Sequence, residues 1–122
     1  MTILALLIAA SINCNNPITQ ADMTQCAHRE SILYDKQLAN VWKRAQEWAK
    51  GEDRDLDRTY DKRPTNSQRL LESQRAWIIY KDSHCDMESW KYRGGSMEPM
   101  IYSMCTTAVT KRRIKELQEM IS

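Results

Sequence analysis

The segment QRAWIIYKDSHCDMESWKYRGGSMEPMIYSMC, residues 74–105, decides the fold that this sequence predicts. It places two cysteines, Cys85 and Cys105, on either side of the pair Gly94-Gly95. Apolar residues recur at helical spacing before the glycines and again after them. The segment therefore predicts the end of one helix, a turn, and the start of a second helix that runs back beside the first.

Each of these two helices has a start signal. The earlier helix is predicted to begin near Thr65, with Gln68 as its capping-box partner, and to end before Gly94-Gly95. The later helix is predicted to begin with Ser96 as its N-cap and Pro99 in its first turn, where proline is tolerated. The apolar positions expected to face the core are Leu70, Leu71, Trp77, Ile78 and Cys85 on the earlier helix, and Met100, Ile101, Met104, Cys105, Ala108, Ile114, Leu117 and Ile121 on the later one. We interpret the Met and Trp residues on these stripes as core rather than as a cofactor site.

A third helical stretch precedes these two. Thr19-Gln20-Ala21-Asp22 is a capping pattern placed just after Pro17, and apolar residues then recur at helical spacing as far as Trp48. Lys50-Gly51 predicts the end of this helix, with the glycine in the left-handed conformation that ends many helices. Residues 51–64 are a charged connector, so the whole chain is predicted to be an all-α, antiparallel three-helix bundle.

The N-terminus carries the signs of an export signal. Residues 3–10 are an uninterrupted apolar run, which is far shorter than the roughly 20 residues that span a bilayer but suits a signal peptide. We predict a signal peptide over residues 1–11 and a mature domain over residues 12–122, located in the periplasm or outside the cell, with no stable membrane insertion. The alternative is a bacterial lipoprotein anchored through Cys14, although Asn13 stands where a small residue is expected.

Export changes how the cysteines are interpreted. Cys14, Cys26, Cys85 and Cys105 form an even set, which in an oxidising compartment indicates two disulfides. Four cysteines allow three pairings, and the sequence alone leaves the choice open. Proximity along the chain favours Cys14–Cys26 and Cys85–Cys105.

Composition and motifs favour a binding protein over an enzyme. The 122 residues include 18 basic and 16 acidic side chains, for a net charge of +2, which is too balanced to predict a nucleic-acid partner. His28 and His84 each lie near a cysteine, but oxidised cysteines supply no thiolate for a metal site or a nucleophile. The sequence contains no phosphate loop, serine-hydrolase elbow or zinc-protease motif. We therefore predict no catalytic residue, no metal and no cofactor.

Residues 14 to 117 resemble a bacterial family, the lysozyme-inhibitor LprI N-terminal-like domain. The resemblance rests on the order of the four cysteines, on Q-R-A-W at residues 74–77 and on G-G-S at residues 94–96. Further matching positions are Thr19–Ala27, Asp35, Leu38, Tyr80-Lys81-Asp82, Tyr92-Arg93, Pro99-Met100, Thr110, Arg113 and Leu117. The sequence departs from the family at Ala39, where asparagine is common, and this puts any contact of that asparagine in doubt.

The resemblance implies an extracytoplasmic helical domain with a protein partner, and the family name makes lysozyme the first candidate. We expect the partner to bind at the disulfide-pinned turn and at the Q-R-A-W motif, through Tyr92, Arg93, Gly94, Gly95, Ser96, Arg75 and Trp77. The alternative is a purely structural role, in which the glycines permit a turn, Ser96 caps a helix and Trp77 is buried. Common lysozymes are strongly cationic, so a net charge of +2 opposes attraction unless a local acidic patch is present.

Two other classes of function stand beside this one. An envelope interaction module, such as an immunity protein or an accessory subunit, would co-purify with a partner other than lysozyme. A hydrolase without a known motif would have a polar cleft that contains a titratable group with a shifted pKa.

Overall fold

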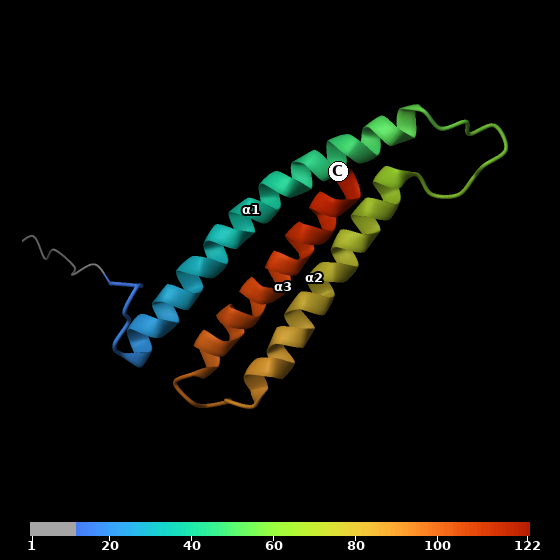
Figure 1. The fold of residues 1–122 in the computed structure, drawn as a ribbon. Helices are drawn as coiled ribbons and strands as arrows, with labels where there is room; N and C mark the ends of the chain where they lie inside the picture. The colour runs from blue at the N-terminus through green and yellow to red at the C-terminus, as the bar shows by residue number, and fades with distance from the viewer. Residues whose placement is uncertain (1–11) are drawn as a thin grey trace, which may run out of the picture.

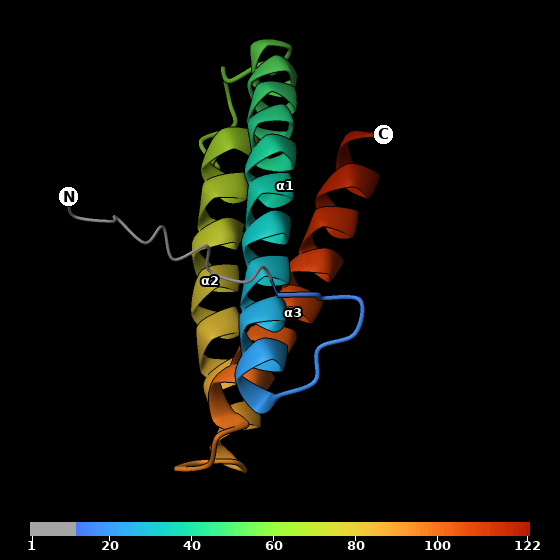
Figure 2. The ribbon, with the colours of Figure 1, turned by 90° about the vertical axis from the view of Figure 1, so that its left-hand side faces the viewer.

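The computed structural model describes residues 12–122 and folds them into three antiparallel helices (Figure 1). α1 comprises Gln20–Arg54, α2 comprises Asn66–Trp90 and α3 comprises Glu98–Ile121. α3 packs against both other helices and shares its larger interface with α1. Figure 2 shows α2 on one side of α1 and α3 on the other. The predicted all-α bundle is confirmed, whereas the predicted signal peptide lies outside the described residues.

The apolar core occupies one half of the bundle. It is built by the later part of α1, the beginning of α2 and the end of α3. Its buried residues are Leu38, Val41, Ala45, Ala49, Leu70, Ile114 and Leu117, and Tyr34, Trp42, Trp48, Trp77 and Ile121 pack against them. The predicted place of Trp77 in the core is therefore confirmed, and Trp42 and Trp48 of α1 pack there as well. Within residues 12–122, no helix is both long enough and apolar enough to cross a bilayer.

Two disulfides hold the other half of the bundle. Cys85 of α2 is bonded to Cys105 of α3, and Cys14 is bonded to Cys26 of α1, with Cα atoms 5.5 Å apart in each pair. This is the pairing that proximity along the chain favours. Because the Cys14 sulfur is in a disulfide, it is not free to carry a lipid, which argues against the lipoprotein alternative.

The predicted end of the first helix at Gly51 is wrong, because α1 continues to Arg54. The carboxylate of Asp53, on this last turn, accepts hydrogen bonds from the backbone N–H groups of Asn66 (2.7 Å) and Ser67 (3.0 Å) at the start of α2. These N–H groups have no partner within their own helix. The extra turn of α1 therefore caps α2. The predicted capping box at the start of α2 is confirmed.

The predicted N-cap of α3 is also wrong. The N-cap is Met97 rather than Ser96, and it makes no side-chain hydrogen bond. Gly94 has a φ of 76°, a left-handed conformation that glycine adopts without steric cost. Its N–H donates to the Glu98 carboxylate at 2.8 Å. The side chain of Glu98, the first residue of α3, is thus hydrogen-bonded to the turn that precedes the helix. Ser96 is exposed and does not cap the helix.

Some positions predicted to face the core face solvent instead. Leu71, Ile78, Met104 and Ala108 are exposed. Adjacent residues of a helix point about 100° apart, so a helix that packs one narrow face buries only one residue of a neighbouring pair. Leu70 is buried while Leu71 is exposed, and Trp77 is half-buried while Ile78 is exposed.

The disulfides give a stability prediction. Replacing Cys85 and Cys105 together with serine is expected to lower the free energy of unfolding by about 3 kcal/mol, because the bond closes a loop of 20 residues. The matched variant Cys14→Ser/Cys26→Ser is expected to lose less, because Cys14 is exposed whereas Cys85 is fully buried. Urea denaturation of both variants measures the difference. A larger loss from the Cys14–Cys26 pair would contradict this ranking.

The cap at Asp53 gives a pH-dependent prediction. Hydrogen bonds from Ser67 and Asn66 lower the pKa of Asp53 below its usual 3.8, despite a smaller opposing effect of desolvation. Because the folded pKa is the lower one, the stabilisation is complete well above pH 3.8 and is lost as the pH falls through the folded value. Asp53→Asn should therefore lower the melting temperature by a few degrees at pH 7, and the difference should shrink below pH 3.8. A difference that stays constant down to pH 2, measured by circular dichroism, would contradict the cap.

Candidate partner-binding cleft

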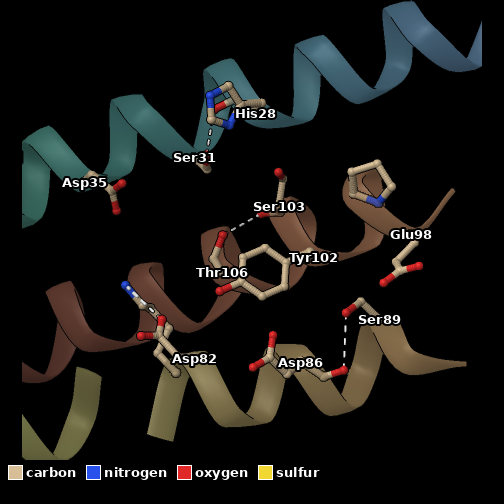
Figure 3. Close-up of a pocket in the computed structure, with 12 residues that line it drawn as sticks. His28, Ser31, Asp35, Asp82, Asp86, Ser89, Glu98, Tyr102, Ser103 and Thr106 are labelled. Atoms are coloured by element: carbon tan, nitrogen blue, oxygen red, sulfur yellow. Dashed lines mark hydrogen bonds and ion pairs between the residues drawn. The ribbon is translucent and has the colours of Figure 1, made fainter. Parts of the chain in front are cut away.

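A cleft of about 550 Å³ opens among the three helices at the disulfide-bonded end of the bundle (Figure 3). Most of the residues that line it have polar or charged side chains, and each helix contributes to them. The lining residues are His28, Ser31 and Asp35 of α1, Lys81, Asp82, Asp86 and Ser89 of α2, and Glu98, Pro99, Tyr102, Ser103 and Thr106 of α3. Because four of these residues are Asp or Glu, we refer to the site as the acidic cleft. Its shape depends on how the three helices are held together.

The Cys85–Cys105 disulfide sets the spacing of two of these walls. Asp82 and Asp86 lie within one helical turn of Cys85, and Tyr102 lies one turn before Cys105. On the remaining wall, His28 follows the disulfide-bonded Cys26 by two residues. Both disulfides thus hold the segments that line the acidic cleft.

Carboxylates dominate the cleft, although the whole chain has a net charge of +2. Lys81 is the one lysine against four acidic residues, Asp35, Asp82, Asp86 and Glu98. Its Nζ lies 3.8 Å from Asp82 Oδ1 and 5.2 Å from the centre of the Trp77 ring. Within residues 12–122, Asp35 and Asp86 make no ion pair. Glu98 makes no ion pair among these residues either, but it accepts a hydrogen bond from the Gly94 N–H. The cleft is therefore a local acidic patch in which Asp35 and Asp86 have neither an ion pair nor a side-chain hydrogen bond among the described residues.

Tyr102 is the cleft residue whose ionisation is most affected by this setting. Burial raises the pKa of its phenol above the usual 10.0, and the negative charges of Asp82 and Asp86 raise it further. Figure 3 shows the ring on the side of α3 that faces these two carboxylates. Tyr102 consequently stays protonated at neutral pH and is available as a hydrogen-bond donor.

Ser103 lines the cleft with a hydroxyl that has no partner among the described residues. Only 8% of this residue is exposed, and its hydroxyl makes no hydrogen bond to the rest of the described chain. Its backbone carbonyl accepts a hydrogen bond from the Thr106 hydroxyl at 3.0 Å. Figure 3 shows the Ser103 hydroxyl pointing from α3 across the cleft toward α1. In the described part of the chain, the side-chain oxygens that are fully enclosed without a partner are those of Thr107 and Thr110, so the Ser103 hydroxyl is instead an accessible acceptor or donor on the cleft wall.

The residues predicted to bind a partner do not line the acidic cleft. Tyr92 through Ser96 form the exposed turn beyond α2, where the Arg93 guanidinium lies 4.9 Å from the centre of the Trp90 ring. Arg75 is exposed on α2, whereas Trp77 is half-buried against the core. A role for these residues in binding stays a prediction.

Two residues from the matching motifs meet inside the bundle. The buried Arg113 donates through Nε to Oε1 of the buried Gln74 at 2.9 Å, and through its terminal nitrogen to the Ser73 hydroxyl at 3.0 Å. Gln74 is the first residue of Q-R-A-W. This part of the motif therefore joins α2 to α3 rather than facing a partner.

The hydrolase hypothesis predicts a polar cleft with a shifted pKa, and the acidic cleft has both. The shift does not suit acid–base catalysis, however, because the pKa of Tyr102 moves away from neutrality. The Ser103 hydroxyl is not hydrogen-bonded to His28, and the Ser31 hydroxyl donates to the backbone carbonyl of His28 rather than to its ring, so neither forms the nucleophile–base pair of a serine hydrolase in this structure. The arrangement fits binding of a cationic group better than hydrolysis.

Comparison with known proteins identifies a family and a relative of this chain. The model of a family described as "Lysozyme inhibitor LprI" matches residues 13–117. An uncharacterized protein of Rhizobium meliloti (strain 1021) is 31% identical over 112 residues, which cover 89% of this chain and 78% of the relative. No solved structure matches the chain. The segment matched by the family contains all four cysteines and every residue that lines the acidic cleft.

The acidic cleft gives a prediction for Tyr102. Replacing Asp82 and Asp86 with asparagine should lower the pKa of Tyr102, but leave it above 10.0 because burial remains. The absorbance of tyrosinate during an alkaline titration measures this, and a Tyr102→Phe variant identifies which of the five tyrosines is responsible. An unchanged pKa in the asparagine variant would contradict the proximity of the phenol to these carboxylates.

Proposed function

The chain belongs to the lysozyme inhibitor LprI family, and from this premise we propose that it is an exported protein that binds lysozyme and protects the cell wall. Membership of the family is the observation that carries the proposal. On this view the protein acts by occupying the enzyme and catalyses nothing itself.

The disulfides support a site of action outside the cytoplasm. All four cysteines are paired, and none of them is free. Structural disulfides persist in oxidising compartments such as the periplasm and are rare in the reducing cytosol. Lysozyme reaches bacterial peptidoglycan from outside, so an inhibitor has to be exported to meet it.

The acidic cleft offers local negative charge although the chain as a whole is positive. Common lysozymes are strongly cationic, and a chain with a charge of +2 would repel them at long range. Charge complementarity at a contact is local, however, and four carboxylates in one cleft offer it. A helix pair held by a disulfide also presents this surface without a large ordering cost on binding.

A second candidate function is an envelope interaction module, such as an immunity protein or an accessory subunit, without activity against lysozyme. The acidic cleft favours it equally, because the cleft selects a cationic partner but not a particular one. A partner other than lysozyme, captured from an envelope extract, would favour this alternative.

Inhibition of lysozyme is directly measurable. The oxidised protein, residues 12–122, should slow the clearing of a cell-wall suspension by lysozyme at near-stoichiometric amounts. The Cys85→Ser/Cys105→Ser variant is the control for a protein that lacks the pinned helix pair, and it should inhibit less. If the wild-type protein has no effect on several types of lysozyme, the proposed function is wrong.

A further inference from the structure

α2 carries an apolar surface that the bundle does not use. Four large side chains on the side away from the core are exposed, namely Ile79 (68%), Tyr80 (53%), Met87 (59%) and Trp90 (63%). Helical spacing places them on one face, with the small residues Ala76 and Ser83 between them. We refer to these six residues as the α2 stripe. Contiguous exposed apolar surface of this kind marks interaction sites, and Trp and Tyr are the residues that most often dominate binding energy.

The α2 stripe borders the acidic cleft. Asp82 follows Ile79 by three residues, and Asp86 precedes Trp90 by four, so each carboxylate is a surface neighbour of a stripe residue. Both carboxylates also line the cleft. The apolar and acidic surfaces are therefore continuous, with an apolar face beside a charged recess.

The recess is suited to an organic cation. Asp35 on α1 and Asp86 on α2 offer negative charge that no ion pair neutralises, and the Ser103 hydroxyl, which points from α3 toward α1, offers a further acceptor on the cleft wall. Within residues 12–122, no group of three His, Cys, Asp or Glu side chains is arranged to hold a metal ion. A guanidinium or ammonium group carries several donors, which match carboxylate and hydroxyl acceptors.

The charges also favour a cationic partner over a second copy of this chain. An antiparallel pairing that buried the α2 stripe of two copies would bring Asp82 and Asp86 of one copy against the same residues of the other. Like charges placed opposite each other oppose association. A basic surface would meet the same carboxylates with attraction. Arg93, whose guanidinium lies 4.9 Å from the centre of the Trp90 ring, is an opposing positive charge at that end of the stripe.

We propose that the α2 stripe and the acidic cleft form one docking surface for a cationic protein. Apolar residues of the partner pack on the stripe, and one arginine or lysine side chain of the partner enters the cleft, where Asp35 and Asp86 oppose its charge and Ser103 accepts a hydrogen bond. This proposal rests on the proposed function and adds to it the place and the chemistry of the contact.

Two variants test the docking surface against a cationic lysozyme. Asp35→Asn/Asp86→Asn removes the unpaired cleft charges, and Met87→Ala/Trp90→Ala truncates the α2 stripe. Each should weaken binding about tenfold or more by calorimetry, as expected for loss of a buried charge contact or an aromatic anchor. The matched controls are Glu47→Gln/Glu52→Gln, which removes two exposed carboxylates of α1 far from the cleft, and Leu33→Ala, which removes an exposed apolar side chain of α1. Both should bind within about twofold of the wild type.

The binding measurements test the docking surface and the inhibition of lysozyme separately. If the wild type binds lysozyme and both test variants bind equally well while remaining folded by circular dichroism, the docking surface is wrong and the inhibitor function stands. If the wild type binds no lysozyme, the inhibitor function fails, and the cleft is then tested with N-acetyl-arginine amide as the probe.

The probe experiment uses the folded wild-type chain and nuclear magnetic resonance. The probe should shift the amide signals of Tyr102, Ser103 and Thr106, and these shifts should disappear in Asp35→Asn/Asp86→Asn. Shifts that are absent, that spread over acidic residues throughout the surface, or that persist in the variant would overturn the proposed cation site.

Discussion

The Cys85–Cys105 disulfide does in one half of this bundle what apolar packing does in the other. Leucine, valine, isoleucine and alanine side chains fill the half that contains Leu38 and Leu117. In the half around the disulfide, the buried side chains include Ser89, Ser103 and Thr107, which contribute little apolar burial. A covalent bond keeps α2 and α3 together there without apolar filling. The bundle can therefore leave a polar cleft between its helices, which a small packed core would have to close.

Polar contacts at the other half fix the alignment of the same two helices. Arg113 is a buried guanidinium. Its acceptors are Gln74 Oε1 and Ser73 Oγ on α2 and the Glu116 carboxylate on its own helix, at 3.3 Å. A buried charge without acceptors is strongly destabilising, so this contact allows little change in register between α2 and α3. Together with the disulfide, it makes the pair a rigid platform on which α1 completes the cleft. The residues that align α2 and α3 are thus different from those that the proposed docking surface uses.

Local signals in the sequence predicted the helices well but not all of their ends. The caps at Thr19 and Thr65 depend on residues within one turn, and both are present. The predicted helix end at Gly51 and the predicted N-cap at Ser96 are wrong. At both places the carboxylate of a nearby residue, Asp53 or Glu98, accepts hydrogen bonds from outside its own helix, which a local pattern does not reveal.

The cleft was not predicted because its residues come from three helices, and its shape depends on how each helix is rotated about its axis. The spacing of Asp82 and Asp86 by four residues was its only local sign. The placement of the segments that line the cleft depends on the two disulfides, Cys14–Cys26 and Cys85–Cys105. Peptide mapping without reduction, on protein recovered from the cell envelope, tests this most directly. We predict the pairs Cys14–Cys26 and Cys85–Cys105 with no free thiol, and a different pairing or free cysteines would contradict the fold described above.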